Sequence, residues 1–425
     1  MSKMHIFTNA MLQNREGLTD IAVAGDIFLK IQPDLTALFP EAETTDLGGR
    51  LVIPPYVDSH IHLDYVNTAL LSKTANHSST LFEGIECWAN QKESFTEEEI
   101  KERAREVIRD LIGYGVQYVR THVDVTEPSL RGMRAMLELR EEMRPYMRIQ
   151  LVAFPQEGML SFPGGAELVE EGLRMGADAV GAIPHWEFTR EMGIDSVRRA
   201  VELAVRYDRL VDVHCDETDD EQSRFLETLA AAAHHAGIGA RVTASHACAS
   251  GAYNGAYFQR LLRLVQISGM NFAICPPENL HLQGRWDGYP KRRGIARVAE
   301  LLDAGVNVSF GQDSICDPWY PMGTGNPLNV LDVGVHACQL TDLERSAGCL
   351  DLVTVNGART LGLEPGEYGI EEGRPANFLV LDAYRTFDAV RRHARVLRSV
   401  REGRMLFTRE PDRMHSDDAF LNDFA

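Results

Sequence analysis

Along the middle of the chain, short apolar runs rich in valine and isoleucine alternate with segments of about 12–18 residues whose apolar positions recur at helical spacing. This alternation is typical of βα units, in which a buried strand is followed by an amphipathic helix. The runs that predict strands are Leu51–His62, Val116–His122, Ile149–Phe154, Ala177–Ile183, Leu210–His214, Arg241–His246, Asn271–Cys275 and Val306–Gly311. Their continuous apolar character is the pattern of parallel strands that are buried on both faces.

A helix is predicted after each of these eight runs. The helical segments are Thr96–Gly113, Ser129–Met143, Gly164–Met175, Asp195–Tyr207, Asp219–Ala236, Ala256–Ile267, Arg297–Ala304 and Leu328–Leu340. Thr96 and Glu99 have the spacing of a capping box at the start of the first helix. Eight strands that alternate with eight helices predict an α/β fold, a (β/α)8 barrel of the TIM type.

Both ends of the chain carry short strand patterns that do not fit the barrel. These runs are His5–Thr8, Ile21–Val23 and Ile27–Ile31 near the N-terminus, and Ala376–Asp382, Ala394–Val400 and Arg404–Phe407 near the C-terminus. Because chain ends often lie near each other in a domain, we expect the two groups to pair into a small β-sandwich-like domain. The predicted organisation is residues 1–50 plus 370–415 as this β domain, 51–369 as the barrel, and 416–425 as an acidic tail.

Composition narrows the class of protein. Of 425 residues, 44% are hydrophobic and 25% are charged, which is ordinary for a globular protein. The formal net charge of −19 argues against nucleic acid or an anionic membrane as a partner, because both would be repelled. We find no signal peptide pattern and no apolar run near the ~18 residues that a spanning helix needs. The seven cysteines include no CxxC pair and suit reduced thiols. From composition we therefore expect a soluble, cytoplasmic enzyme, whose reaction composition does not identify.

Barrel enzymes carry their catalytic groups at the C-terminal ends of the strands, and the first predicted strand ends in a histidine pair. His60 and His62 are two residues apart, so their imidazoles project to one side of the strand while Ile61 faces the other. Two neutral imidazoles on one side favour a divalent metal. A chain with 14 histidines can also hold such a pair incidentally.

Further ionisable residues end strands five, six and eight. They are His214, His246 and Asp313. Each taken alone fits a satisfied core histidine or, for Asp313, a helix cap. Together they fall at one end of one barrel, where burying them without a metal or partners would be costly. His60, His62, His214 and Asp313 therefore predict the coordination of one divalent ion, with a position left for water.

Other polar residues at strand ends have two interpretations each. Gln156 follows strand three, where its amide can both donate to and accept from a flat heterocycle, or can face solvent. Trp319 lies just beyond Asp313 and can either wall a ring-shaped ligand or pack within its own loop. We assign supporting roles around the site to the remaining residues, His122 with Asp124 and His185 with Glu187.

Motifs for nucleotide chemistry are absent from the sequence. There is no Walker A motif, and Gly323-Thr324-Gly325 lacks the third glycine of a dinucleotide-binding loop. The basic run Lys291–Arg293 is too short for a nucleic-acid site on an acidic protein and is interpreted as a solvated face.

Nine segments occur in the same order and with matching spacing in a known family. They are LVIPPYVDSHIHLD, TLFEGIE, VRTHVDV, LVAFPQEG, ADAVGAIPHWEFTRE, VDVHCDETDDEQSRF, ARVTASHA, HLQGRWDGYPKRRGI and GQDSICDPWYPMGTGN. On these segments the chain resembles the amidohydrolase superfamily and, within it, the bacterial cytosine deaminases. The resemblance implies a homo-oligomer with one Fe²⁺ or Zn²⁺ ion per chain, held by His60, His62, His214 and Asp313.

The resemblance also implies roles for other residues. It makes Glu217 the proton shuttle, His246 the residue that orients the hydrolytic hydroxide, and Gln156 a contact to the pyrimidine. Binuclear members of the superfamily carry a carboxylated lysine at the end of strand four, where this chain has Val180–His185 without lysine, so a second metal of that type is not expected. Physical chemistry agrees, because a divalent ion lowers the pKa of bound water to about 7. Asp313 can take the proton of that water, and Glu217, with a pKa raised by an enclosed site, can protonate the ring nitrogen beside the attacked carbon.

One position departs from the family pattern. Cytosine deaminases of this family usually carry a second aspartate directly after the metal-binding one, facing the ring near C5, and this chain has Ser314 there. Serine is smaller and uncharged, so a methyl group at C5 fits. The expected substrates are therefore cytosine and, at least equally, 5-methylcytosine, giving uracil or thymine plus ammonia. Isoguanine is a further candidate, since the same N–C(–NH₂) unit is attacked.

Two rival interpretations remain from the sequence. One is a creatinine-type deaminase of a cyclic amidine on the same scaffold, which the size of the ring framed by Gln156 and Trp319 would distinguish. The other is a catalytically silent barrel that serves as an interaction protein. Loss of the metal ligands or of Glu217 would favour it, and all of them are present.

Overall fold

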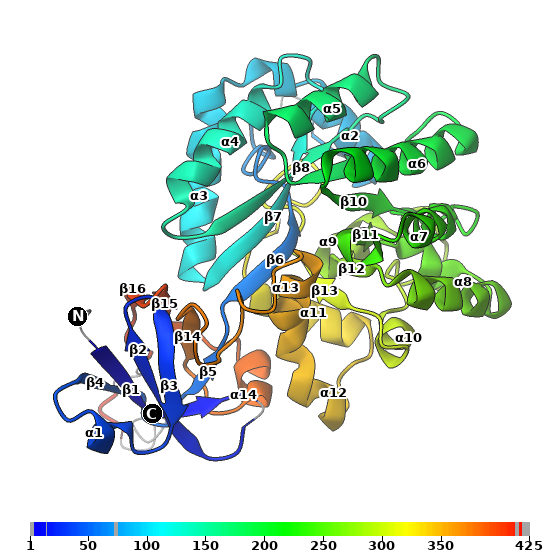
Figure 1. The fold of residues 1–425 in the computed structure, drawn as a ribbon. Coiled ribbons are helices and arrows are strands. Elements are labelled where there is room, and N and C mark those ends of the chain that lie inside the picture. The colour runs from blue at the N-terminus through cyan, green and yellow to red at the C-terminus, as the bar shows by residue number, and fades with distance from the viewer. Residues whose placement is uncertain (1–3, 14, 72–74, 413–415, 419–425) are drawn as a thin grey trace. The chain divides into compact units, whose positions relative to one another are not determined.

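The computed structural model describes residues 4–13, 15–71, 75–412 and 416–418. The chain divides into two compact units, one formed by residues 1–55 with 366–425 and the other by residues 56–365. In Figure 1 the first unit combines the blue and the red ends of the chain, and the second runs from light blue to orange. No helix among the described residues combines the length and the apolar character needed to cross a membrane.

The second unit is a nearly closed barrel of eight parallel strands, which confirms the predicted (β/α)8 fold (Figure 1). Side chains of these strands are almost all buried, as expected for a parallel sheet that is covered by helices. The strands, in their order around the sheet, are β6 (Tyr56–Ile61), β7 (Val116–Asp124), β8 (Arg148–Phe154), β9 (Ala179–Ala182), β10 (Leu210–Cys215), β11 (Val242–His246), β12 (Asn271–Ile274) and β13 (Val308–Phe310).

The barrel closes where the last strand meets the first. The backbone N–H of Asp313 donates to the carbonyl of His60 at 2.8 Å, and the N–H of His62 donates to the carbonyl of Asp313 at 3.2 Å. Gly311 permits this approach, because a Cβ there would lie 2.8 Å from the His60 carbonyl oxygen. Closure of the barrel therefore brings the histidine pair and Asp313 side by side.

A helix follows each barrel strand, as predicted. These helices are α3 (Glu97–Gly113), α4 (Arg131–Met143), α5 (Gly165–Met175), α6 (Arg190–Tyr207), α7 (Phe225–Ala236), α8 (Gly255–Ser268), α10 (Val298–Asp303) and α11 (Pro327–Ala337). The capping box at Thr96 is present, with its side chain bound to the backbone N–H of Glu99 and the reciprocal bond also formed.

The helix predicted from Asp219 begins later, at Phe225. The carboxylate of Asp216 accepts hydrogen bonds from the backbone N–H groups of Phe225 and Leu226, at 3.0 and 2.9 Å. These N–H groups lack a partner within the helix, so a carboxylate supplied from the end of β10 caps it there. The intervening residues form a loop beside the strand end.

Short helices and 3₁₀ turns that the sequence analysis did not predict also belong to the barrel unit. They are α2 (Leu81–Ala89), α9 (Pro276–Leu282), α12 (Leu343–Gly348), α13 (Val355–Thr360) and the turns at Lys92–Ser94, Gly239–Arg241, Cys248–Ala252 and Cys349–Val353. Two of them, α2 and α9, follow β6 and β12 and matter for the site described below.

The first unit is built on an eight-stranded sheet from both chain ends, which confirms that these ends form a separate sheet. Its order is β16-β15-β14-β5-β1-β2-β3, with β4 paired to β1. The elements are β1 (Met4–Leu12), β2 (Leu18–Ala24), β3 (Ile27–Gln32), α1 (Leu35–Leu38), β4 (Glu43–Asp46), β5 (Leu51–Ile53), β14 (Phe378–Leu381), α14 (Thr386–Arg391), β15 (Val396–Arg401) and β16 (Arg404–Thr408). Its core is apolar and includes Phe7, Phe28 and Phe378.

One predicted strand was wrong as a single element. The run Leu51–His62 divides into β5, which pairs with β1 and β14, and β6, which is the first barrel strand. Pro54 and Pro55 separate the two, because a proline has no N–H to donate to a sheet. The predicted acidic tail, 416–425, lies outside the described residues except for 416–418.

Candidate active site

Four buried side chains converge where the barrel closes: His60 of β6, His62 directly after β6, His214 of β10, and Asp313 just after β13. One ligand atom from each lies within 4.8 Å of the others. The Nε2 atoms of His62 and His214 are 3.1 Å apart, and Asp313 Oδ1 is 3.5 Å from His60 Nε2 and 3.4 Å from His62 Nε2. The four residues predicted as metal ligands are thus brought together.

The donor set fits a divalent metal. His60 Nε2 is buried and has no hydrogen-bond partner, although it points at Asp313. Three imidazole nitrogens and one carboxylate oxygen are the ligands that Zn²⁺ and Fe²⁺ accept in proteins. A buried ring nitrogen without a partner is costly, and a metal at this point would remove that cost.

A chain of hydrogen bonds fixes the orientation of His60. The hydroxyl of Ser245 donates to Asp212 Oδ1 at 2.6 Å, so the same oxygen accepts a hydrogen bond from His60 Nδ1 at 2.8 Å. Asp212 is in turn paired with the fully buried guanidinium of Arg120 at 2.9 Å. With the proton held on Nδ1, the lone pair of His60 Nε2 faces the other three ligands.

Burial favours the neutral form of two of the three histidines in the cluster, His62 and His214. It lowers the pKa of His62, and it lowers the pKa of His214 well below the usual value. His60 differs, because Asp313 outweighs burial and raises its pKa. Burial alone would raise the pKa of Asp313, but His60 and His246 hold it well below its usual value. A neutral imidazole and a charged carboxylate are the forms that bind metals.

Glu217 is buried near this cluster, two residues beyond β10. Its Oε2 is 3.8 Å from His246 Nε2 and 3.9 Å from His185 Nε2. Burial and the nearby charge of Asp313 raise the pKa of Glu217 well above its usual value. A carboxyl group held as the neutral acid near neutral pH is able to donate a proton to a bound ligand.

His246 ends β11 and connects Asp313 with Glu217. Its Nδ1 is 3.6 Å from Asp313 Oδ2 and 3.1 Å from the side-chain amide of Asn279, while its Nε2 faces Glu217. Asp216, His246 and Asp313 all adopt positive φ angles, of 53°, 67° and 68°. At His246 and Asp313 this left-handed backbone accompanies side chains that face each other, whereas the Asp216 carboxylate turns away to cap α7. Such strain clusters at functional sites.

Gln156 and Trp319, two of the predicted substrate contacts, are buried. Gln156 is 3% exposed, and its Oε1 has no hydrogen-bond partner. Trp319 is also 3% exposed, and its ring lies 4.7 Å from that of Tyr65, which stacks on His62 at 4.6 Å. The indole N–H of Trp319 donates to the carbonyl of Leu81 at 3.2 Å. Trp319 therefore packs against α2, which forms one side of the candidate site.

Ser314 has two acidic neighbours that the sequence analysis missed. These neighbours are Glu278 on α9 and Asp317, and a hydrogen bond from the Ser314 hydroxyl lowers the pKa of both carboxyl groups. Burial has the larger effect, so the pKa of Glu278 lies well above its usual value and that of Asp317 is raised to about 7. Glu278 is 1% exposed, and its Oε2 has no hydrogen-bond partner. The sequence signal for Glu278 is a charged residue that follows two prolines just after the apolar run Asn271–Cys275.

The four residues assigned supporting roles divide into two kinds. His122 lies beside His60, with ring centroids 4.1 Å apart, and His185 borders Glu217. Asp124 instead accepts hydrogen bonds from the Trp88 indole at 2.9 Å and from Lys92 at 3.1 Å. Glu187 accepts bonds from backbone N–H groups in the loop after β8. The histidines border the cluster, whereas the carboxylates hold nearby loops.

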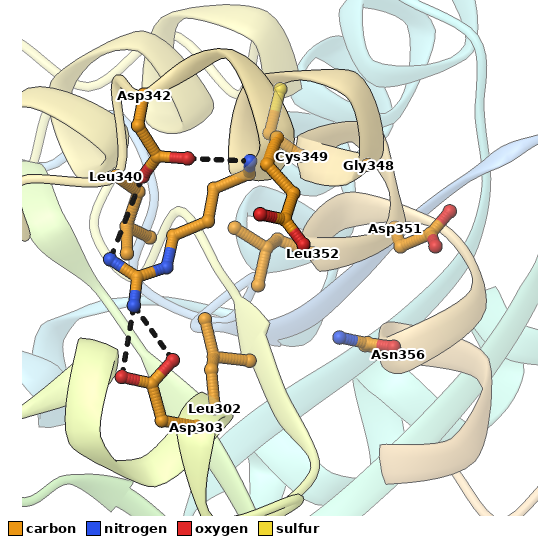
Figure 2. Close-up of a pocket in the computed structure, with 11 residues that line it drawn as sticks. Leu302, Asp303, Leu340, Asp342, Gly348, Cys349, Asp351, Leu352 and Asn356 are labelled. Carbon is orange, nitrogen blue, oxygen red and sulfur yellow. Dashed lines mark hydrogen bonds and ion pairs between the residues drawn. The ribbon is translucent and has the colours of Figure 1, made fainter.

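A separate cavity of about 620 Å³ contains none of the predicted site residues (Figure 2). It is lined by residues of α10, α12 and the turn after α12, including Asp303, Asp342 and Cys349. Arg345 is paired with Asp303 at 2.7 Å and with Asp342 at 3.6 Å. We assign no function to this cavity.

Comparison with known proteins identifies relatives over nearly the whole chain. A model of the amidohydrolase family matches residues 43–407. N-isopropylammelide isopropyl amidohydrolase of Pseudomonas sp. (strain ADP) is 30% identical over 94% of this chain and 96% of its own length. Pterin deaminase of Rhizobium rhizogenes is 27% identical over 93% of this chain and 90% of its own length.

A solved structure is more similar still. The crystal structure of 5-methylcytosine deaminase from Klebsiella pneumoniae, liganded with 5-fluorocytosine, matches with 50% identity and a TM-score of 0.94. The match covers 97% of this chain and 99% of that one. A second structure of the same enzyme, liganded with phosphonocytosine, matches with a TM-score of 0.93.

Proposed function

Because the chain belongs to the amidohydrolase family and is a hydrolase that acts on C–N bonds, we propose that it deaminates a free pyrimidine base, 5-methylcytosine or cytosine. The observation that carries this proposal is the convergence of the buried Glu217 with the cluster of three histidines and Asp313 at one end of the barrel. The similarity to a 5-methylcytosine deaminase supports the substrate class.

We assign the metal to His60, His62, His214 and Asp313. When bound, a divalent ion supplies a Lewis acid and lowers the pKa of water. Asp313, held as the carboxylate, accepts a proton from the attacking water. Glu217, held as the neutral acid, gives a proton to the ring nitrogen beside the attacked carbon and later helps the amine to leave.

Other residues position the reactants. His246 contacts both Asp313 and Glu217, so it orients the water between the proton acceptor and the proton donor. The free Oε1 of Gln156 is available to a ring N–H of the base. The enclosed site excludes bulk water, which strengthens each of these interactions.

The screen that tests the proposal measures ammonia release from cytosine, 5-methylcytosine, isoguanine and creatinine by the metal-loaded protein. We expect release from the two pyrimidines, with product identified as uracil or thymine. Release from creatinine alone would contradict the proposed pyrimidine chemistry, and release from isoguanine alone would move the proposal to a purine base.

Ser314 is proposed to admit the C5 methyl group. The Ser314→Asp variant adds a third carboxyl beside Glu278 and Asp317, in the space that the methyl group needs. We expect the ratio of kcat/KM for 5-methylcytosine to that for cytosine to fall at least tenfold, a change of about 1.4 kcal/mol. The Ser314→Ala control keeps the space and keeps the preference. An unchanged ratio in Ser314→Asp would show that Ser314 is not the determinant.

A further inference from the structure

Glu278 is a buried acid that the mechanism above does not use. It lies on α9, is 1% exposed, and leaves its Oε2 without a hydrogen-bond partner. A buried polar atom left unpaired is costly, so such an atom beside a binding site indicates a group on the ligand that completes it.

Glu278 lies among the residues of the candidate active site. The charges of Asp313, Asp317 and Glu217 act on its carboxyl, and the hydroxyl of Ser314 interacts with it. The next residue, Asn279, contacts His246 Nδ1 at 3.1 Å, which holds this turn of α9 against the site. The carboxyl of Glu278 therefore lies beside Ser314, while the carboxyl of Glu217 lies beside His246.

The reacting carbon of the base has three neighbours, and this step rests on the proposed function. One is the ring nitrogen that Glu217 protonates, the second is C5, which faces Ser314, and the third is the amine that leaves. The amine carries two N–H bonds in the plane of the ring. One of them points toward the ring nitrogen, and the outer one points toward the C5 side, where Ser314 and Glu278 lie.

We propose that Glu278 accepts a hydrogen bond from the outer N–H of the leaving amine, through the oxygen that has no protein partner. The contact orients the amine while the C–O bond to the water oxygen forms and the C–N bond breaks with its electron pair passing to nitrogen. The two protons of the water go to the ring nitrogen and to the amine, which leaves as ammonia. Glu278 neither gains nor loses a proton in this balance.

This role gives Glu278 a part in selecting substrates. A base with an N–H at this position completes its hydrogen bonding, whereas a base with an ether oxygen there offers no donor. Sites built to hold a donor discriminate strongly against analogues without one, because a buried acceptor is then left unpaired.

Two variants and two ligands test the proposal. Glu278→Leu removes the acceptor, and Glu278→Gln keeps an acceptor oxygen of the same reach. For each protein we would measure kcat/KM for cytosine and Ki for 4-methoxy-2-pyrimidinone as a competitor, together with metal content and Tm. In Glu278→Leu we expect kcat/KM to fall at least tenfold while Ki stays within threefold, and in Glu278→Gln we expect at least a third of the wild-type kcat/KM.

Two results would overturn the proposal. One is a kcat/KM for cytosine in Glu278→Leu within threefold of wild type, and the other is a loss of affinity for the methoxy competitor by the same factor as the loss of kcat/KM. If the leucine of Glu278→Leu prevents folding, Glu278→Met replaces it, because methionine also removes the acceptor and fills the same space with an unbranched side chain. The same kcat/KM and Ki values are then measured for Glu278→Met. Failure of the proposed function is separate, because the wild-type protein would then release no ammonia from cytosine or 5-methylcytosine.

Discussion

Glu217 has the environment of a proton donor, since burial and Asp313 raise its pKa while His185 and His246 border its carboxyl. Replacing Glu217 by Gln keeps the shape but removes the acidic proton. We expect kcat to fall by at least about 100-fold, the lower end for a positioned proton donor. Metal content should stay at the wild-type level, because Glu217 is not one of the four ligands.

The control for this variant is Glu221→Gln, which changes an exposed carboxylate on the same loop. Steady-state kinetics with metal analysis of both proteins is the measurement. A fully active Glu217→Gln protein would rule out the role in proton transfer.

Ser245 is expected to act on the metal through His60. Without its hydroxyl, His60 Nδ1 loses its acceptor, and the ring is no longer held with its Nε2 lone pair toward the site. We expect Ser245→Ala to weaken metal affinity about 10- to 100-fold, as for other residues that orient metal ligands. Competition with a chelator measures the change.

Ser59→Ala is the matched control for Ser245→Ala. Ser59 is a buried strand serine in β6, but its hydroxyl bonds to Ser309 and not to a metal ligand. Equal loss of metal affinity in both variants would show that the effect comes from the barrel core and not from the orientation of His60.

At the residue scale, the sequence predicts the ionisable residues at the ends of the barrel strands, which include the proposed metal ligands. His60 and His62 alternate along one strand, and His214, His246 and Asp313 each end another, so barrel topology alone predicts that they meet. Ser245 and Glu278 were not found, because their roles depend on which atom each faces. A serine in a strand and a glutamate in a short helix have no spacing that reveals such a neighbour.

At the element scale, α2 positions the wall that Trp319 forms. Gly84 makes this contact possible, since a Cβ there would lie 2.5 Å from Trp319 Cδ1 and Nε1. Gly84→Ala therefore forces the indole away and strains its bond to the Leu81 carbonyl. We expect a loss of about 1–3 kcal/mol in stability from overpacking and a higher KM for the base.

Thermal unfolding and KM values are the measurements for Gly84→Ala. Gly255→Ala on α8 is the control, because a Cβ there meets nothing within 4 Å. An unchanged KM in Gly84→Ala would show that Trp319 does not contribute to substrate binding.

The elements with strong patterns were predicted from the sequence, and those set by tertiary contacts were not. Val116–His122 and Leu210–His214 are continuous apolar runs, and both are barrel strands. Leu51–Ile53 has the same apolar character, but it joins the other sheet because two prolines follow it. Helix α9 is short and begins with two prolines, so periodicity gives no signal for it.

At the scale of the whole molecule, the net charge of −19 and the enclosed site favour a small free base over a polymer, because the surface of such a chain repels nucleic acid. Burial of the site also affects the stability of the protein. The fold buries histidines and aspartates together in the barrel, where burial moves the pKa of several of them, including Asp317 and His185, away from the usual value.

The buried aspartates and histidines oppose each other in their effects on stability. Burial raises the pKa of Asp58, Asp64 and Asp317 to about 7 each, so the stability they contribute is full below about pH 4 and is lost as pH rises through 7. Burial lowers the pKa of His185 to about 3. The unfolded chain protonates this histidine near pH 6.5, so its contribution is full above that pH and is lost as pH falls toward 3.

Replacing His185 by Gln isolates this contribution, because all other titrations are common to both proteins. We expect the free energy of unfolding of the wild type, minus that of His185→Gln, to be constant above about pH 7 and to fall by up to about 1.4 kcal/mol per pH unit below pH 6. Urea unfolding at several pH values measures it, and His336→Gln, which changes an exposed histidine on α11, gives the reference for a solvated side chain. A difference that does not vary between pH 7 and pH 5 would show that His185 takes up a proton in the folded protein as readily as in the unfolded chain.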